Sequence, residues 1–460
     1  PSPQKPSLKQ KTKSSVDTFF YFLLISLFGI LVIFSGISKI TGSSDFFWHL
    51  ATGKWIIEHR IIPDKDVFGF ISEHQQWIPF EWGWDVLIYI LFSVTNSYTL
   101  IQVFPIIIWC GIFLMLITVA RKFNIPINIV VIILLLTLLA TLDRFSPRPH
   151  IITLLGLSII ISLYTSVRMF SPKYFKLLLV LPLIFLVWAN MHMGVLAGIL
   201  LLITIFITEI FLLFTSSKLK FRDTFLQPLN SSTLKLFALI LCTCIFFIFC
   251  NPFGYKTFVY VYNHTQMNML KEIIEWYPSF SGKLESSGIL LSYKVLIALG
   301  LLSLYYSIKK KNILMASLFL VFAPYSMQAI RFIADYAVVT FFGTSLGMNY
   351  MLEKSSLIIQ KTIHSLSVSV LLCLILLYSI FTISNNSLYE KINYNRTFGF
   401  GVDEKFFSLN LIKFLKQNEI YGRPFNNLLL GGLMSWEIPQ QKIFIDSRNI
   451  SDSLEIVNIE

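Results

Sequence analysis

Ten acidic and imidazole side chains gather in one short stretch, residues 44–85. The rest of the chain is poor in charge, because Asp, Glu, Lys and Arg make up only 13% of its 460 residues. Carboxylates and imidazoles are the usual groups of general acid–base catalysis. We therefore expect the chemistry of this protein to lie in this stretch, which contains Asp45, His49, Glu58, His59, Asp64, Asp66, Glu73, His74, Glu81 and Asp85.

Asp45 and His49 are four residues apart, the spacing that places two side chains on one face of a helix. Ser44 directly precedes them and is a typical helix N-cap. Desolvation beside an apolar wall raises the basicity of a carboxylate, so Asp45 is our candidate general base. The structural alternative is that Asp45 only complements the helix dipole and that His49 is a satisfied interfacial side chain.

Further along, ionisable residues stand at the ends of two consecutive apolar runs. Asp143 and Arg144 follow the first run, and Arg148 and His150 precede the second. Such residues are costly unless they are paired or face a cavity. Because a guanidinium suits phosphate oxygens, Arg144, Arg148 and Arg331 are candidate ligands of an anionic group. The alternative is an Asp143–Arg144 pair that only ties two helix ends together.

Asn190 and His192 flank a turn between two apolar runs. They either hydrogen-bond a lipid phosphate or a sugar, or only cap helix ends. Glu275 lies in a second long polar loop, at about residues 251–288, and either reaches the same cavity or is a solvated loop acid. The full set of candidate substrate-binding residues is His49, Glu81, Arg144, Arg148, His150, Asn190, His192 and Arg331.

An apolar scaffold must position these residues. The chain is 55% hydrophobic and has a mean hydropathy of +0.70, which is too apolar for a soluble globular protein and indicates a polytopic membrane protein. We expect about eleven transmembrane helices, several of them only 13–16 residues long. Such short spans predict a polar cavity that cuts into the outer leaflet. The spans lie near residues 18–37, 100–120, 127–142, 151–164, 177–189, 194–215, 234–250, 289–307, 313–325, 333–351 and 366–383.

Lysine and arginine clusters between the apolar runs set the topology. The tail carrying Lys5, Lys9, Lys11 and Lys13 is cytoplasmic by the positive-inside rule, which places the first outer loop, residues 42–85, and the C-terminus outside a cytoplasmic membrane. A short apolar segment, residues 86–94, then returns toward the bilayer. The net charge of +12 reflects these clusters, and we expect no nucleic-acid partner.

Hydropathy falls after about residue 385, where the transmembrane domain of residues 1–384 ends. Residues 406–417 have helical spacing of apolar side chains, and residues 427–430 and 442–445 resemble short buried strands. Gly431 and Gly432 are typical of a tight turn between such elements. We expect a small extracytoplasmic α/β domain over residues 385–460. Few residues follow its last strand, which is consistent with a domain that is cut short.

Motifs along nearly the whole chain resemble those of bacterial polytopic glycosyltransferases of the GT-C type. In the first outer loop they are Asp45-Phe-Phe-Trp-His-Leu-Ala-Thr-Gly-Lys-Trp-Ile, Ile62-Pro-Asp-Lys-Asp66-Val-Phe and Trp77-Ile-Pro-Phe-Glu81-Trp. They continue through Arg148-Pro-His, Trp188-Ala-Asn190-Met-His192, Asn251-Pro-Phe-Gly, Glu275-Trp276, Arg331, Gly431-Gly-Leu-Met-Ser-Trp-Glu-Ile-Pro and Ile443-Phe-Ile-Asp446-Ser-Arg448. The related pattern often has His in place of Phe80 and Gly in place of Ser447.

This resemblance implies an enzyme that moves a sugar from a polyprenyl-phosphate donor in the membrane to an extracytoplasmic glycan, lipid or protein. Asp45 would inherit the role of base. The activated acceptor hydroxyl would attack the anomeric carbon with inversion, while Arg144, Arg148 or Arg331 offsets charge on the leaving lipid phosphate. Hard cations favour carboxylates, so Asp45 with Glu81 or Asp85 could bind Mg²⁺ or Mn²⁺, although we assign no metal ligand.

Two other classes of protein remain open. One is a lipid or glycan transporter or flippase, and the other is a non-catalytic assembly or binding factor on a GT-C-like scaffold. A transporter places ionisable residues near the midplane and often shows repeated halves, whereas here the charges cluster at one interface and no repeat is visible. The decisive observation is whether Asp45 lines a cavity together with the arginines.

Overall fold

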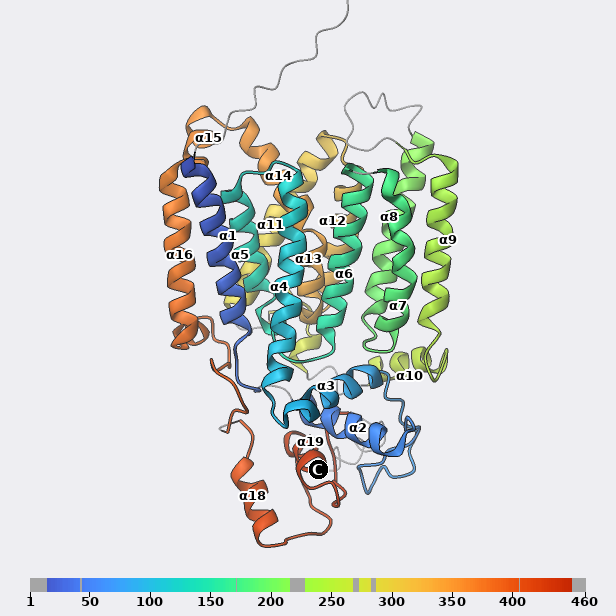
Figure 1. The fold of residues 1–460 in the computed structure, drawn as a ribbon. Helices are drawn as coiled ribbons and strands as arrows, with labels where there is room; N and C mark the ends of the chain where they lie inside the picture. Colours follow the sequence, from blue (N-terminus) through green and yellow to red (C-terminus); the bar gives the residue numbers. More distant parts are fainter. Residues whose placement is uncertain are drawn as a thin grey trace, which may run out of the picture.

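The computed structural model describes residues 15–41, 44–170, 172–215, 228–267, 273–282, 287–404 and 406–448. Helices are the regular elements of these ranges, which contain three isolated bridges and no strand. Figure 1 shows an upright helix bundle with a layer of shorter elements at its lower end. The N-terminal lysines that support the predicted topology lie outside the described residues.

Seven helices of the described part are long and apolar enough to span a membrane. Shorter apolar helices stand among them in the same bundle (Figure 1), and the predicted count of about eleven spans stays a prediction. The seven are α1 (Ser15–Gly36), α4 (Thr99–Lys122), α6 (His150–Thr165, continued by a π turn, Ser166–Phe170), α8 (Val195–Thr215), α9 (Ser231–Ile248), α11 (Gly288–Lys309) and α16 (Leu366–Ser384). The shorter ones are α5 (Ile127–Ala140), α7 (Leu181–Ala189), α12 (Ile313–Gln328), α13 (Ile333–Val339) and α14 (Phe341–Lys354).

The outer faces of the bundle helices are apolar. Phe22, Leu114 and Leu239 are each about 60% exposed, although they belong to the most hydrophobic segments of the chain. In hydrocarbon, helices satisfy every backbone hydrogen bond within the segment, and large apolar side chains on the surface contact lipid tails. The bundle is therefore that of a membrane protein.

The polar layer combines three separate parts of the chain. The first outer loop contributes α2 (Asp45–His59) and α3 (Trp82–Thr95), the second contributes α10 (Lys256–Thr265), and the C-terminal part contributes α17 (Ser387–Lys391), α18 (Leu409–Gln417) and α19 (Leu428–Glu437). The predicted return of residues 86–94 toward the bilayer is wrong, because α3 packs on α2 in the outer layer (Figure 1). The short α15 (Leu357–Ile363) lies at the opposite end of the bundle.

The predicted α/β domain is not found in the described residues. Residues 427–430 begin a helix, because the side chain of Asn427 accepts a hydrogen bond from the backbone N–H of Leu430 and caps α19. Gly431 and Gly432 lie inside α19 and not in a turn. A Cβ at Gly431 would be 2.0 Å from the carbonyl oxygen of Ile445, so glycine permits close packing here.

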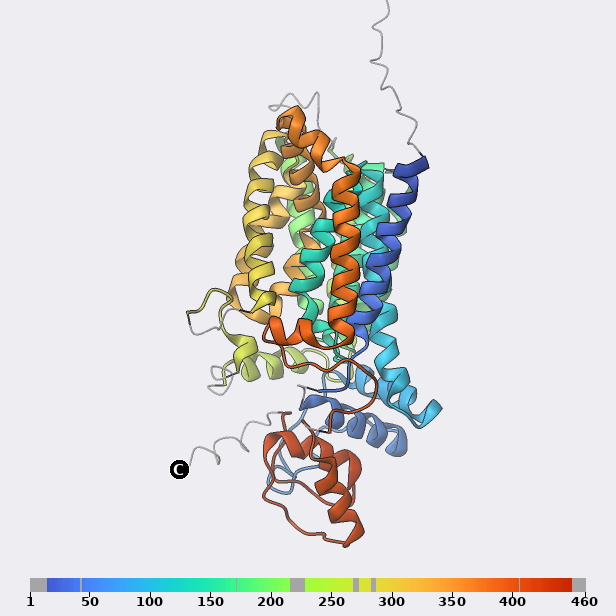
Figure 2. The ribbon, with the colours of Figure 1, turned by 90° about the vertical axis from the view of Figure 1, so that its left-hand side faces the viewer.

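The C-terminal part packs on the first outer loop through backbone pairing. The N–H of Phe70 donates to the carbonyl of Ile443 at 3.0 Å, and the N–H of Ile443 donates to the carbonyl of Phe68 at 2.9 Å. This pairing is a single isolated bridge, Gly69 with Ile443, where a strand over residues 442–445 was predicted. Figure 2 shows the C-terminal part beneath the bundle.

A buried ion pair fixes the joint between the first outer loop and the C-terminal part. Arg448 Nη1 lies 2.6 Å from Asp66 Oδ1, and Arg448 Nε lies 2.7 Å from Asp446 Oδ2. The guanidinium also lies over the rings of Phe68 and Trp77, at 4.9 and 4.6 Å. Satisfied buried charges of this kind specify one arrangement of the segments that they join.

A second buried ion pair connects α6 and α8 inside the bundle. Arg168, in the π turn, donates from Nε to Glu209 Oε1 at 2.7 Å and from Nη2 to Oε2 at 3.0 Å, and the Tyr164 hydroxyl donates to the same carboxylate. Both charged side chains are almost completely buried. Each charge is therefore stabilised by its partner and not by water.

Replacement of Glu209 by alanine should destabilise the bundle by about 3–5 kcal/mol, because it leaves the Arg168 charge buried without its partner. Equilibrium unfolding in mixed micelles would measure the loss. Glu58 is the matched control, since it forms an exposed pair with Lys54, and Glu58→Ala should change stability by less than about 1 kcal/mol. Equal effects of the two substitutions would contradict the structural role of Glu209.

Candidate active site

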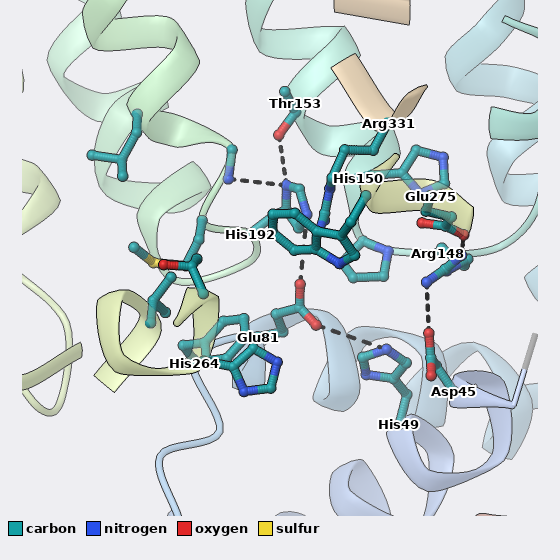
Figure 3. Close-up of a pocket in the computed structure, with 18 of the residues that line it drawn as sticks. Asp45, His49, Glu81, Arg148, His150, Thr153, His192, His264, Glu275 and Arg331 are labelled. Carbon is teal, nitrogen blue, oxygen red and sulfur yellow. Dashed lines mark hydrogen bonds and ion pairs between the residues drawn. The ribbon is translucent and has the colours of Figure 1, made fainter. Parts of the chain in front are cut away.

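A cavity of about 940 Å³ lies between the end of the bundle and the polar layer. The predicted polar cavity is thus present, and Figure 3 shows the side chains that converge on it from the two outer loops, α6 and the α7–α8 turn. Eight of the nine candidate site residues line it, namely Asp45, His49, Glu81, Arg144, Arg148, His150, His192 and Arg331. Asp45 and the three arginines therefore share one cavity.

Arg148 joins the two outer loops at the start of α6. Its Nη2 lies 2.6 Å from Asp45 Oδ2, and its Nη1 lies 2.8 Å from Glu275 Oε1, as Figure 3 shows. The Arg148 guanidinium holds the pKa of Glu275 well below its usual range, with smaller contributions from Arg144 and Arg331. Glu275 is therefore an ionised wall residue of the cavity and not a solvated loop acid.

Asp45 opens α2, as predicted, and faces the cavity together with His49. The predicted capping bond of Ser44 is missing, because its side chain does not bond to a backbone N–H of the helix. The Ser447 hydroxyl donates to Asp45 Oδ1 at 2.7 Å and accepts from Trp48 Nε1 at 3.1 Å. A residue of the C-terminal part thus helps to hold the candidate base.

The other two arginines differ in how their charge is compensated. Arg144 is buried, with Nε 3.1 Å from Asp143 Oδ2 and Nη1 3.5 Å from Glu275 Oε2, so it both ties helix ends together and lines the cavity. Arg331 lies over the ring of Trp276 at 4.3 Å. Among the described residues, no carboxylate lies within ion-pair distance of Arg331. The Arg331 guanidinium is therefore available to bind an anion.

Glu81 lies between two imidazoles. Its Oε2 is 3.8 Å from His49 Nε2 and its Oε1 is 3.6 Å from His192 Nε2, as Figure 3 shows. Burial raises the pKa of Glu81 to about 8, and the charge of Asp45 acts in the same direction. Burial also lowers the pKa of His49 to about 3. At neutral pH, Glu81 is therefore largely protonated and His49 is neutral.

Both imidazole rings are held by hydrogen bonds at their Nδ1 atoms. Asp85 Oδ1 lies 2.5 Å from His49 Nδ1. The N–H of Gly194 donates to His192 Nδ1 at 3.1 Å, so this atom is an acceptor. The Thr153 hydroxyl, which accepts from Trp188 Nε1, therefore donates to His192 Nδ1 at 2.7 Å. With Nδ1 acting as the acceptor, the proton of the neutral His192 ring is on Nε2 and points toward Glu81.

Asn190 is the candidate that does not line the cavity. Its Oδ1 accepts from Trp82 Nε1 at 3.0 Å, and its Nδ2 donates to the carbonyl of Cys250 at 3.0 Å. Its own carbonyl accepts from the N–H of Gly83, where a Cβ would be 2.7 Å from that oxygen. Asn190 therefore ties the start of α3 to the α7–α8 turn, which brings Glu81 beside His192.

The carboxylates do not form a ready cation site. Asp45 is paired with Arg148, and the fully buried Asp85 faces His49. In the described part of the chain, no group of three or more His, Cys, Asp or Glu side chains is placed to hold a metal ion. The ligand set of Asp45 with Glu81 or Asp85 considered for Mg²⁺ or Mn²⁺ thus does not fit this arrangement, and we derive no step through a cation.

Two further residues of the site were not predicted from the sequence. Thr153 lies one helical turn after His150 in α6, and a hydroxyl in an apolar run is the only local signal that it could serve His192. Ser447 is 402 residues away from Asp45. Its contact with Asp45 follows from the packing of α19 and the segment after it, which no local pattern specifies.

Comparisons with known proteins identify the fold. No family model matches this chain, and no curated protein sequence matches it either. Among solved structures, it resembles the archaeal oligosaccharyltransferase AglB of Archaeoglobus fulgidus in complex with an inhibitory peptide and a dolichol-phosphate, with a TM-score of 0.62 and 11% identity over 95% of this chain and 65% of that one. Two further structures of the Archaeoglobus fulgidus oligosaccharyltransferase are similar. The apo form has a TM-score of 0.54 and 12% identity over 97% and 66% of the two chains, and the form tethered to an acceptor peptide has a TM-score of 0.57 and 10% identity over 93% and 64%.

The likeness confirms the predicted GT-C type of fold, since AglB is a glycosyltransferase of that type. At 10–12% identity, it concerns the fold alone. The chain spans about two thirds of the length of the archaeal chains that it matches.

The raised pKa of Glu81 predicts a pH-dependent stability. Between the ordinary value of 4.5 and about 8, the folded protein binds a proton that the unfolded chain releases, so the free energy of unfolding should fall as pH rises through this range. The loss attributable to Glu81 is up to about 1.4 kcal/mol per pH unit. Glu81→Gln should therefore stabilise the protein at pH 8 and have a much smaller effect at pH 5, as measured by unfolding in mixed micelles. Parallel pH profiles of the two proteins would contradict the burial of this carboxyl.

Proposed function

We propose that this protein is a membrane glycosyltransferase that transfers a sugar from a polyprenyl-phosphate donor to a hydroxyl-bearing or amide-bearing acceptor. The observation that carries the proposal is the shared cavity of Asp45 and three arginines at the end of an apolar bundle. Such a site can hold an anionic headgroup while its lipid tail stays in the membrane. A dolichol-phosphate is bound in a related archaeal structure, and an acceptor peptide is tethered in another, which supports a lipid-linked donor here.

In the proposed reaction, Asp45 accepts the proton of the acceptor. The acceptor atom then attacks the anomeric carbon in line, the bond from this carbon to the phosphate oxygen breaks, and the lipid phosphate leaves with the electron pair. Each carboxylate oxygen can accept more than one hydrogen bond, so Asp45 can receive the acceptor while it remains bonded to Arg148 and Ser447. In-line attack inverts the configuration of the anomeric carbon.

The arginines have different roles in the proposed reaction. Arg148 is committed to Asp45 and Glu275 and orients the base, whereas Arg331 has no carboxylate at ion-pair distance in the described residues. Developing negative charge is stabilised most by donors that are already in place. Arg331 is therefore the proposed main ligand of the phosphate, with Arg144 beside it.

The proposed setting is the cytoplasmic membrane, with the cavity on the outer side. Basic residues at the ends of α4 and α11, including Arg121, Lys122 and Lys309, lie at the end of the bundle away from the polar layer (Figure 1). Positive residues favour the cytoplasmic face. The acceptor would accordingly be an extracytoplasmic glycan, lipid or protein.

Asp45→Asn should reduce transfer by at least about a hundredfold, because general-base catalysis typically contributes this much. The assay follows radiolabelled sugar from a panel of polyprenyl-phosphate sugars to membrane extracts. Asp64 lies in the same outer loop but is exposed, so Asp64→Asn is the matched control and should keep full activity. Undiminished transfer by a correctly folded Asp45→Asn would remove Asp45 as base, and binding without transfer by the wild type would favour a flippase or binding factor.

Arg331→Gln should weaken binding of a short isoprenyl phosphate by about tenfold or more, because it removes a charged hydrogen-bond donor. Isothermal titration in detergent would measure the affinity. Arg60→Gln serves as control, since Arg60 is exposed at the end of α2. An unchanged affinity of the Arg331 variant would assign the phosphate to another part of the cavity.

A further inference from the structure

Three buried polar side chains converge on the cavity with hydrogen-bonding atoms that have no partner among the described residues. The Glu81 carboxyl lies 3.8 Å from His49 Nε2 and 3.6 Å from His192 Nε2, and both distances are beyond that of a hydrogen bond. The His49 side chain is 2% exposed, that of His192 12% and that of Glu81 13%. All three residues line the cavity, so these atoms are available to a ligand that enters it.

Hydrogen bonds hold both imidazoles in place. Asp85 holds His49 at Nδ1, and Thr153 and Gly194 hold His192 at Nδ1. The backbone that carries Glu81 is fixed as well, because Glu81 precedes α3, whose first turn is tied to Asn190. The two Nε2 atoms therefore keep a fixed geometry, and fixed hydrogen-bonding groups bind a ligand with little loss of side-chain freedom.

The chemistry of the group suits hydroxyls and disfavours phosphate. Both imidazoles are neutral, and Glu81 is protonated or negative at any pH, so the group has no positive charge to attract an anion. A neutral carboxyl both donates and accepts a hydrogen bond, as does a hydroxyl. The positive charge of the cavity lies instead on Arg331 and Arg148, both of which act electrostatically on Glu81.

We infer that Glu81, His49 and His192 form a subsite that binds ring hydroxyls of the sugar on the lipid-linked donor. The inference rests on the proposed function and specifies where in the cavity the sugar binds. With the phosphate on Arg331, the sugar extends across the same cavity to Glu81. This arrangement presents the anomeric carbon between the phosphate and Asp45.

The test compares binding of two probes to detergent-solubilised protein. One is a short isoprenyl phosphate, and the other is the same isoprenyl phosphate carrying glucose, mannose or N-acetylglucosamine. The wild type should bind at least one glycosylated probe about tenfold more tightly than the bare phosphate. Glu81→Leu should abolish this difference and leave the affinity for the bare phosphate unchanged. Glu81→Gln keeps a donor and an acceptor and should retain most of the difference.

Each other outcome overturns a specific part of the inference. If Glu81→Leu keeps the tenfold preference, or loses affinity for both probes equally, Glu81 does not contact the sugar. If the wild type binds the bare phosphate and gains nothing from any sugar of the panel, the subsite is refuted while the phosphate site of the proposed function stands. If the folded wild type binds neither probe, the proposed function fails as well.

Discussion

The contact of Arg148 with both Asp45 and Glu275 is the interaction on which the polar layer depends. It brings two outer loops to the start of α6, at the border between the apolar bundle and the polar layer. A charge at such a border is costly unless it is paired or faces a cavity, and Arg148 is paired with both carboxylates. These contacts hold the two outer loops and the start of α6 together at one side of the cavity.

The cavity has two electrostatic halves that meet at Glu81. One half contains the arginines together with Asp45 and Glu275. The other contains Glu81 and the two imidazoles, which burial keeps largely uncharged at neutral pH. A ligand with an anionic group and a neutral polyhydroxylated group side by side matches this division. A simple anion would satisfy only one half, and an apolar lipid would satisfy neither.

Local patterns in the sequence predicted the membrane bundle and many of the charged and imidazole side chains of the cavity, because hydropathy and helical spacing are local properties. The i, i+4 relation of Asp45 and His49 and the arginines at span ends are examples. Long-range packing accounts for the failures. Gly431 and Gly432 signal a turn locally, yet they allow α19 to approach the backbone of its neighbours closely. Likewise, the role of Asn190 depends on Trp82 and Gly83, more than 100 residues away.

The joint between Asp66 and Arg448 connects residues 382 positions apart in the chain. During synthesis, the first outer loop emerges long before Arg448 exists, so its buried carboxylate has no counter-charge until translation nears residue 448. The segment that carries Ser447 is therefore made after the bundle helices. A nascent or prematurely terminated chain would hold the arginines and Asp45 in an open and incomplete cavity, which confines the completed site to chains that have been translated through the C-terminal part.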